Sequence, residues 1–260
     1  INESYPNFKD NQIKNLLSSV LLKDLHEYEV NNYKKNWSKN YGTLGAELDF
    51  FCDNDKNFLE FKTINQENHL SKFLVKYECW INKLNDKYKI YIHSYDGDMF
   101  NRKTRYATNL KNLNEMPFFN EVFFKEDLKN LGFKTCETNR SYVGICENEI
   151  LNKFFRIIKD IDRPKLVIYL TLENHVPIKI NNSSNPGFCN KSPINLNPEF
   201  CTLFHLQLNF NKNLNNFIRE LNNNDLLVFF SDTPPMYSVR DRIHFEDYTD
   251  VYFFKKKINN

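Results

Sequence analysis

The sequence lacks any long hydrophobic run. Its 260 residues contain no stretch that approaches the roughly 20 consecutive apolar residues of a membrane helix, and no signal peptide opens the chain. A membrane-spanning helix within these residues is therefore excluded. The chain begins at Ile1, with a charged residue almost immediately at Glu3 and no strand before it. We therefore expect a fragment of a longer protein whose upstream part is missing.

An excess of charge of either sign is also lacking. The sequence has 35 basic and 33 acidic residues, a formal net charge of +2, and the two signs are interleaved along the chain. A surface that binds polyanions needs clustered basic residues. The only notable run of basic residues is the three lysines at 255–257, which we interpret as a solvated chain end. We therefore predict no nucleic-acid partner.

Zinc-binding cysteine motifs are absent as well. The six cysteines form no Cys-x-x-Cys pair and have no histidine nearby at zinc-ligand spacing, which argues against a zinc ribbon. Proximity along the chain favours three disulfides: Cys136 with Cys146, Cys189 with Cys201 and, by elimination, Cys52 with Cys79. Such bonds would place folding in an oxidising compartment, such as a bacterial periplasm. The alternative is six buried free thiols in a cytosolic protein.

The sequence does contain alternating strand and helix patterns. Hydrophobic residues make up 41% of the chain, enough for the core of one large domain. Apolar runs typical of strands buried on both faces occupy residues 89–93, 165–170 and 226–230. Apolar residues recur with helical spacing over residues 10–28, 148–160 and 206–221. This alternation predicts an α/β fold with a mostly parallel central sheet and helices on both faces.

Polar segments follow each of the three predicted strands. His93 ends the first strand, and Arg102 lies nine residues later on the same loop. His175 follows the second strand, and Asp232 follows the third. In a doubly wound sheet, active residues collect at the carboxyl ends of the strands. These segments therefore mark a candidate active-site edge, although a single histidine after a strand is more often structural.

The order of the polar segments along the chain is more informative than any one of them. The series runs ESYP (3–6), YGTLGAEL (41–48), IHSYDGDMFNR (92–102), NHVP (174–177) and DTPP (232–235). It resembles the branch of the sulfatase-like and alkaline phosphatase superfamily that contains lipoteichoic acid synthases and phosphoethanolamine transferases. The stretch DGDMFNR is its most specific piece. The resemblance implies a single catalytic domain over residues 1–260.

The resemblance also implies a nucleophile and a metal site. Thr43 falls on the nucleophile position, and a metal ion activates such a hydroxyl. From its local sequence alone, Thr43 is a helix N-cap. The implied cofactor is a divalent ion, Zn²⁺, Mn²⁺ or Mg²⁺. The implied ligands are Glu3, Thr43, Asp232 and Thr233.

Thr233 departs from the pattern, because the family usually has a metal-binding histidine at that position. A hydroxyl binds transition-metal ions more weakly than imidazole does. Three outcomes are open. Mg²⁺ or Mn²⁺ accepts an all-oxygen site, another side chain such as His244 replaces the missing ligand, or the domain binds a phosphorylated ligand without turnover.

The remaining matched residues indicate the reaction. His93, Arg102 and His175 match positions around a substrate phosphate, where arginine holds nonbridging oxygens and histidine protonates a leaving oxygen. This implies transfer of phosphoethanolamine or phosphoglycerol from a phospholipid to a cell-surface glycan through a phospho-threonine. The alternatives are a phosphodiesterase or phosphatase, and a noncatalytic glycan- or lipid-binding domain. A formylglycine sulfatase is disfavoured because Thr43 cannot be converted to that residue.

The resemblance further implies where the domain works. Full-length relatives carry transmembrane helices upstream, which would explain the abrupt start at Ile1. The cysteine positions resemble those of a bacterial subgroup with extra disulfides. We therefore expect a monomeric domain in the cell envelope, on the periplasmic face of the inner membrane, that acts on an acceptor such as lipopolysaccharide.

Overall fold

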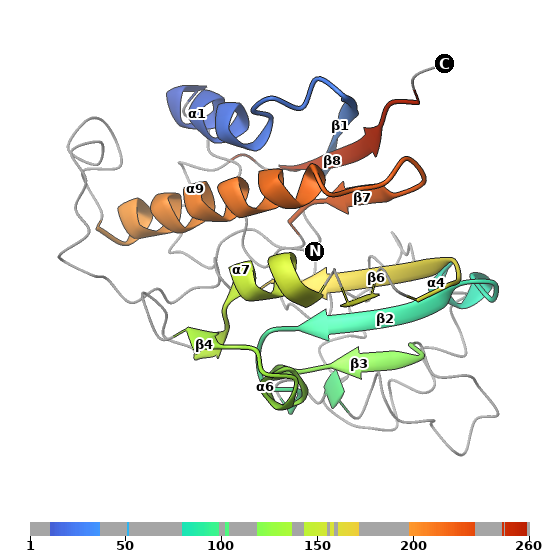
Figure 1. Cartoon of the computed structure of the whole chain (residues 1–260). Coiled ribbons are helices and arrows are strands. Elements are labelled where there is room, and N and C mark those ends of the chain that lie inside the picture. Colours follow the sequence, from blue (N-terminus) through green and yellow to red (C-terminus); the bar gives the residue numbers. More distant parts are fainter. Residues whose placement is uncertain are drawn as a thin grey trace.

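The computed structural model describes a set of segments that together form an α/β fold (Figure 1). They are residues 11–36, 51, 80–98, 102–103, 119–136, 143–154, 157–158, 161–171, 198–231, 246 and 248–258. None of the helices in these segments is long and apolar enough to cross a membrane.

A parallel sheet contains two of the three predicted strands. It comprises β2 (Tyr88–His93), β3 (Glu121–Phe123) and β6 (Lys165–Leu170), in the order β3-β2-β6. β2 lies in the middle and pairs in parallel with both neighbours. The carboxyl ends of β2 and β6 are in register, with His93 opposite Leu170. The prediction of parallel strands at 89–93 and 165–170 is confirmed.

A second sheet is antiparallel. It comprises β1 (Tyr28–Asn36), β8 (Tyr248–Lys256) and β7 (Leu226–Phe229), in the order β1-β8-β7. The third predicted strand becomes β7, but the strand that pairs with it in the described segments is the antiparallel β8. The fold is therefore α/β with mixed sheets, and only part of the predicted parallel sheet is seen.

The helices differ in length from their predictions. α1 (Asn11–Leu21) ends early, because a turn with Asp24 at φ 53° leads into β1. α9 (Pro198–Ile218) begins earlier than predicted, with a proline in the first turn, where its missing N–H costs nothing. The predicted helix 148–160 is short and irregular: α7 (Glu147–Glu149) continues into the π-helical turn η3 (Ile150–Phe154).

The remaining described elements are short and lie close to the parallel sheet. They are α4 (Trp80–Lys83), α6 (Lys125–Asn130) and the two-stranded antiparallel ribbon of β4 (Thr135–Cys136) and β5 (Gly144–Ile145). A disulfide links Cys136, at the end of β4, to Cys146, directly after β5. This confirms the predicted pairing of these two cysteines. Cys201 is disulfide-bonded too, whereas Cys189, Cys52 and Cys79 lie outside the described residues.

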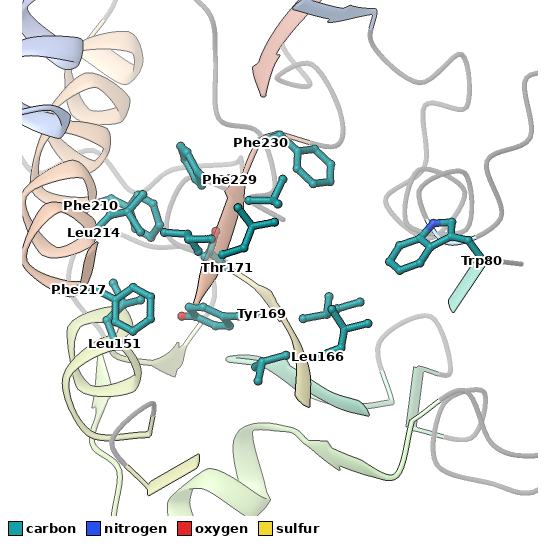
Figure 2. A pocket seen from close by; sticks show the side chains of 15 residues that line it. Trp80, Leu151, Leu166, Tyr169, Thr171, Phe210, Leu214, Phe217, Phe229 and Phe230 are labelled. Atoms are coloured by element: carbon teal, nitrogen blue, oxygen red, sulfur yellow. The ribbon is translucent and has the colours of Figure 1, made fainter. Parts of the chain in front are cut away.

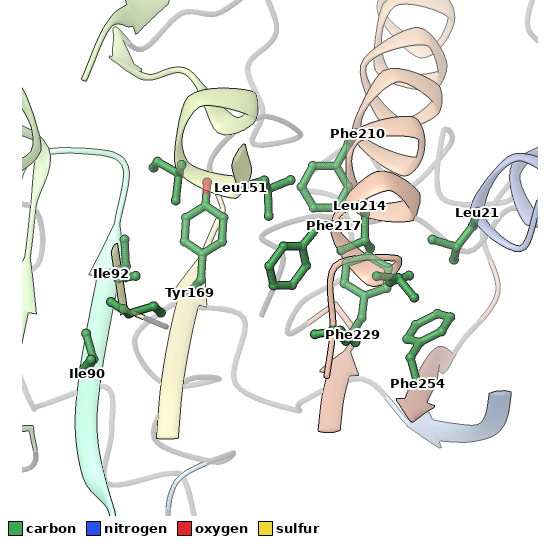
Figure 3. Close-up of a cluster of buried hydrophobic side chains, with 14 of the residues drawn as sticks. Leu21, Ile90, Ile92, Leu151, Tyr169, Phe210, Leu214, Phe217, Phe229 and Phe254 are labelled. Atoms are coloured by element: carbon green, nitrogen blue, oxygen red, sulfur yellow. The ribbon is translucent and has the colours of Figure 1, made fainter. Parts of the chain in front are cut away.

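One hydrophobic core joins the two sheets. It includes Ile90 and Ile92 from β2, Tyr169 from β6, and Phe229 and Phe254 from β7 and β8. Aromatic residues of α9 fill the space between them (Figure 3). A cavity of about 150 Å³ also lies between β6 and β7, and it has mostly apolar walls (Figure 2). The core therefore connects the two sheets, and the cavity lies where β6 of one sheet approaches β7 of the other.

α9 also donates hydrogen bonds to carbonyls at the end of α1. The last four C=O groups of a helix have no partner within the helix. Asn215 donates through Nδ2 to the carbonyls of Leu21 at 2.7 Å and Lys23 at 3.0 Å. Asn211 also donates through Nδ2 to the carbonyl of Leu17, about one turn earlier in α1. Buried amides on α9 thus fix where α1 ends.

Replacing Asn215 by alanine should therefore destabilise the fold. The change removes the two hydrogen bonds that Asn215 donates and the one that its Oδ1 accepts from Nε of Arg219. It also leaves the buried Leu21 carbonyl without this donor, so we expect the free energy of unfolding to fall by about 2–3 kcal/mol. Urea denaturation followed by circular dichroism measures this. Asn223→Ala, in the exposed turn before β7, is the control and should change stability by less than about 0.5 kcal/mol. Equal effects of the two substitutions would contradict this role of Asn215.

Candidate active site

His93 stands at the carboxyl end of β2 and is completely buried. Its Nδ1 lies 3.2 Å from the carbonyl oxygen of Leu170 at the end of β6. Its Nε2 lies 3.3 Å from Nη1 of Arg102. The register of β2 and β6 creates the first contact, because it places His93 opposite Leu170.

Arg102 returns to His93 from nine residues further along the chain. Its side chain is fully buried, and the backbone N–H of the next residue, Lys103, donates to the carbonyl of Gly97 at 2.8 Å. Burying a guanidinium is costly unless polar or anionic groups surround it. The structure thus brings together His93 and Arg102, the two candidate site residues of segment 92–102, and the pair is suited to a phosphate or another oxyanion.

The loop after His93 is held by backbone hydrogen bonds from two other parts of the chain. The carbonyl of Ser94 accepts from the N–H of Ile145 at 2.8 Å, and the carbonyl of Tyr95 accepts from the N–H of Lys125 at 3.0 Å. Ile145 belongs to β5 and Lys125 begins α6. The start of the loop is therefore fixed by the elements packed beside it.

Glu147 is a buried carboxylate that the sequence analysis missed. It is 1% exposed, and its Oε1 accepts a hydrogen bond from the Ser94 hydroxyl at 3.2 Å. Glu147 directly follows Cys146, whose disulfide to Cys136 anchors this segment. The only sequence signal for Glu147 was its position directly after a cysteine that was predicted to form a disulfide. Its link to the residue after His93 became visible only in the folded chain.

Gly97 is required by close packing in the same loop. A Cβ added at this position would lie 2.7 Å from the ring of Phe124. Phe124 is buried and its ring meets the His93 imidazole edge to face, with 6.5 Å between the ring centroids. Any larger residue at position 97 would have to displace a ring that supports His93. This contact explains the glycine within the most specific piece of the motif series.

Buried hydroxyls follow the other two predicted strands. Thr171 comes directly after β6 and Ser231 follows β7 by two positions; they are 3% and 1% exposed. The predicted site residues Thr43, His175, Glu3, Asp232 and Thr233, with the alternative ligand His244, lie outside the described residues. Within the described segments, no group of three or more histidine, cysteine or acidic side chains is placed to hold a metal ion.

Lys89 is a buried charged residue on β2, but it lies toward the opposite end of the strand from His93. Burial lowers the pKa of its ammonium group, which donates to the carbonyl of Ile81 at 3.3 Å. Lys89 precedes His93 by four residues, roughly 13 Å along a strand. We therefore assign it to the structure of the sheet and not to the candidate site.

Sequence comparisons leave the chain without a match. No family model fits it, and no curated protein matches it. Solved structures do match, at sequence identities that bear on the fold alone.

Three solved structures share the fold. The lipoteichoic acid synthase LtaP from Listeria monocytogenes matches 99% of the chain at a TM-score of 0.58 and 15% identity. An alkaline phosphatase superfamily protein from Vibrio parahaemolyticus matches 99% at 0.61 and 10% identity. The phosphoglycerol transferase GacH from Streptococcus pyogenes, solved with sn-glycerol-1-phosphate, matches 93% at 0.53 and 14% identity.

These proteins are longer than the chain. It covers 63%, 59% and 72% of LtaP, the Vibrio protein and GacH respectively. The resemblance read from the motif order is confirmed at the level of the fold. The α/β fold of this chain is similar to those of a lipoteichoic acid synthase, a phosphoglycerol transferase and a protein described as a member of the alkaline phosphatase superfamily.

Proposed function

We propose that residues 1–260 form a single catalytic domain that transfers a phospho-substituent from a phospholipid to a cell-surface glycan. The observation that carries the proposal is the buried pair of His93 and Arg102 at the carboxyl end of the parallel sheet. A buried guanidinium at such an edge is suited to a phosphate group. Neighbours of the same fold that are named as phosphoglycerol transferase or lipoteichoic acid synthase support the reaction class.

The proposed reaction has two balanced steps. In the first, the Thr43 hydroxyl attacks the phosphorus of the donor, the bond from phosphorus to the diacylglycerol oxygen breaks, and diacylglycerol leaves with a proton. In the second, an acceptor hydroxyl attacks the phospho-threonine and Thr43 regains its proton. Arg102 would hold nonbridging oxygens, and His175 would serve the proton transfers. The head group is phosphoethanolamine or phosphoglycerol.

The proposed metal site draws on Glu3, Thr43, Asp232 and Thr233. When bound, the divalent ion would supply Lewis-acid activation of the Thr43 hydroxyl. These ligands are all oxygen donors, a set that suits Mg²⁺ or Mn²⁺ better than Zn²⁺. We therefore favour one of these harder ions over zinc.

The proposed location is the periplasmic face of the inner membrane, with the domain monomeric and tethered through an upstream segment. The disulfide between Cys136 and Cys146 supports this proposal, because such bonds persist in oxidising compartments. A phospholipid donor and a surface glycan such as lipopolysaccharide would both be within reach there.

We also propose that the two sheets are halves of one central sheet with helices on both faces. β6 and β7 are the neighbouring strands of the two halves (Figure 1), and both line the intervening cavity. Edge strands favour pairing, because their outer N–H and C=O groups need partners. Joining them would bring the ends of β2, β6 and β7 to a common edge.

Substituting Thr43 by alanine should abolish the covalent intermediate. Intact mass after incubation with a phosphoethanolamine or phosphoglycerol lipid and Mn²⁺ should show a phospho-adduct on the unmodified chain and none on Thr43→Ala, because the attacking oxygen is gone. Ser19→Ala, an exposed hydroxyl on α1, is the matched control and should keep the adduct.

The same experiment separates the alternatives. Release of the head group without an added acceptor, still dependent on Thr43, would indicate a phosphodiesterase or phosphatase. Lipid binding without an adduct or product, across both donors and all three metals, would indicate a noncatalytic domain. An adduct that survives in Thr43→Ala would show that another residue is the nucleophile.

A further inference from the structure

The hydrogen bonds of His93 define the state of its imidazole ring. The carbonyl oxygen of Leu170, 3.2 Å from Nδ1, can only accept a hydrogen bond, so Nδ1 must carry a proton. The guanidinium of Arg102, 3.3 Å from Nε2, can only donate, so Nε2 must offer its lone pair. Together these contacts describe a neutral imidazole with its proton on Nδ1.

Protonation of this ring would conflict with its surroundings. A proton on Nε2 would point at the N–H of Arg102, and two positive groups would then face each other at 3.3 Å within a fully buried site. The repulsion between like charges is large when water is excluded. The described geometry therefore opposes the protonated state that a proton donor must pass through.

The same contacts give His93 a different task. One of the five N–H groups of a guanidinium is directed to Nε2, which restricts the rotation of the Arg102 side chain. Because Nδ1 is tied to Leu170, the imidazole itself is anchored to the ends of β2 and β6. The Phe124 ring supports it from the side. His93 thus fixes the position of the Arg102 side chain relative to the carboxyl ends of β2 and β6.

We propose that His93 is a positioning residue that holds Arg102 for a phosphate ligand, and that it stays neutral and does not donate the proton to the leaving oxygen. This inference rests on the proposed phosphotransfer. It assigns proton delivery to a group other than His93 and makes the acceptor lone pair of Nε2 the essential property of position 93. A side chain with an acceptor there but no titratable proton should then replace histidine.

Two substitutions test the role of position 93 in turnover. In His93→Gln, the side-chain carbonyl can accept from Arg102, whereas His93→Leu has no acceptor. We expect His93→Gln to keep kcat/KM within about tenfold and to preserve the pH profile of kcat. We expect His93→Leu to lose about 10²–10³-fold, and to lose little further activity when Arg102→Lys is added, because the two residues act together. Equal losses in both single variants, with a limb of the pH profile missing from His93→Gln, would overturn the proposal.

Nuclear magnetic resonance tests the protonation state independently of turnover. In protein with ¹⁵N-labelled histidine, the His93 signals are assigned by their absence in His93→Gln. They should report the neutral Nδ1–H tautomer throughout pH 5–8, the range in which an ordinary histidine changes charge. Protonation within that range, or the Nε2–H tautomer, would overturn the inference. If no donor lipid is turned over, the proposed function fails, and these signals still decide the state of His93.

Discussion

Replacing Arg102 by lysine should lower kcat/KM for the proposed phosphotransfer by about 10²–10³-fold. Lysine keeps the positive charge but cannot hold two phosphate oxygens in parallel while also donating to His93. The buried setting of Arg102 makes the loss larger than at a hydrated surface. Steady-state kinetics with the donor lipid measure the effect, and a thermal melt verifies that the variant is folded.

Arg163→Lys is the matched control for this substitution. The Arg163 guanidinium lies 3.8 Å from the ring centroid of Tyr88, at the amino ends of β2 and β6, far from His93. Arg163→Lys also removes a contact of a planar guanidinium, here with the Tyr88 ring. We nevertheless expect kcat/KM of this variant to stay within about twofold of that of the parent protein. If Arg102→Lys behaved like Arg163→Lys in a folded protein, Arg102 would not bind the phosphate.

Removing the disulfide should cost both stability and activity. The double substitution Cys136→Ser with Cys146→Ser should lower the free energy of unfolding by about 2–3 kcal/mol, because the unfolded chain is no longer restricted. It should also lower kcat/KM by about tenfold or more. The bond anchors Ile145 and Glu147, which hold Ser94 beside His93.

Urea denaturation and steady-state kinetics of the same preparations separate the two effects. Lys134→Ala, which changes an exposed side chain next to β4, keeps the disulfide and should alter stability by less than about 0.5 kcal/mol. A double variant that loses stability while retaining full activity at low temperature would show that the ribbon does not support the His93 loop.

Strong local patterns in the sequence predict part of this fold. The run 165–170 matches β6 at both ends, because its apolar side chains and flanking polar residues define a buried strand. β1 and β8 escape prediction, because Asn, Lys and Asp residues interrupt their apolar residues. Their pairing over the full length of both strands comes from contacts between chain ends more than 200 residues apart. Local periodicity carries no information about such contacts.

The sequence likewise predicted only part of the candidate site. Motif order identified His93 and Arg102 as candidate phosphate-site residues on one loop, and the structure brings their side chains together. The tautomer of His93 depends on Leu170, which only the register between β2 and β6 reveals. Glu147 depends on the fold of a disulfide ribbon beside the loop. Residue types thus indicated candidate site residues, whereas long-range pairing determines how the described ones are oriented.

The cavity between β6 and β7 affects how the domain responds to compression. This cavity is partly open to solvent, and only the part that its mostly apolar walls keep free of water contributes to the change in volume on unfolding. Volume changes on unfolding scale with such voids and reach tens of millilitres per mole. We therefore expect hydrostatic pressure to destabilise the domain, with a contribution from the junction of its two sheets, next to the strand ends that carry Thr171 and Ser231.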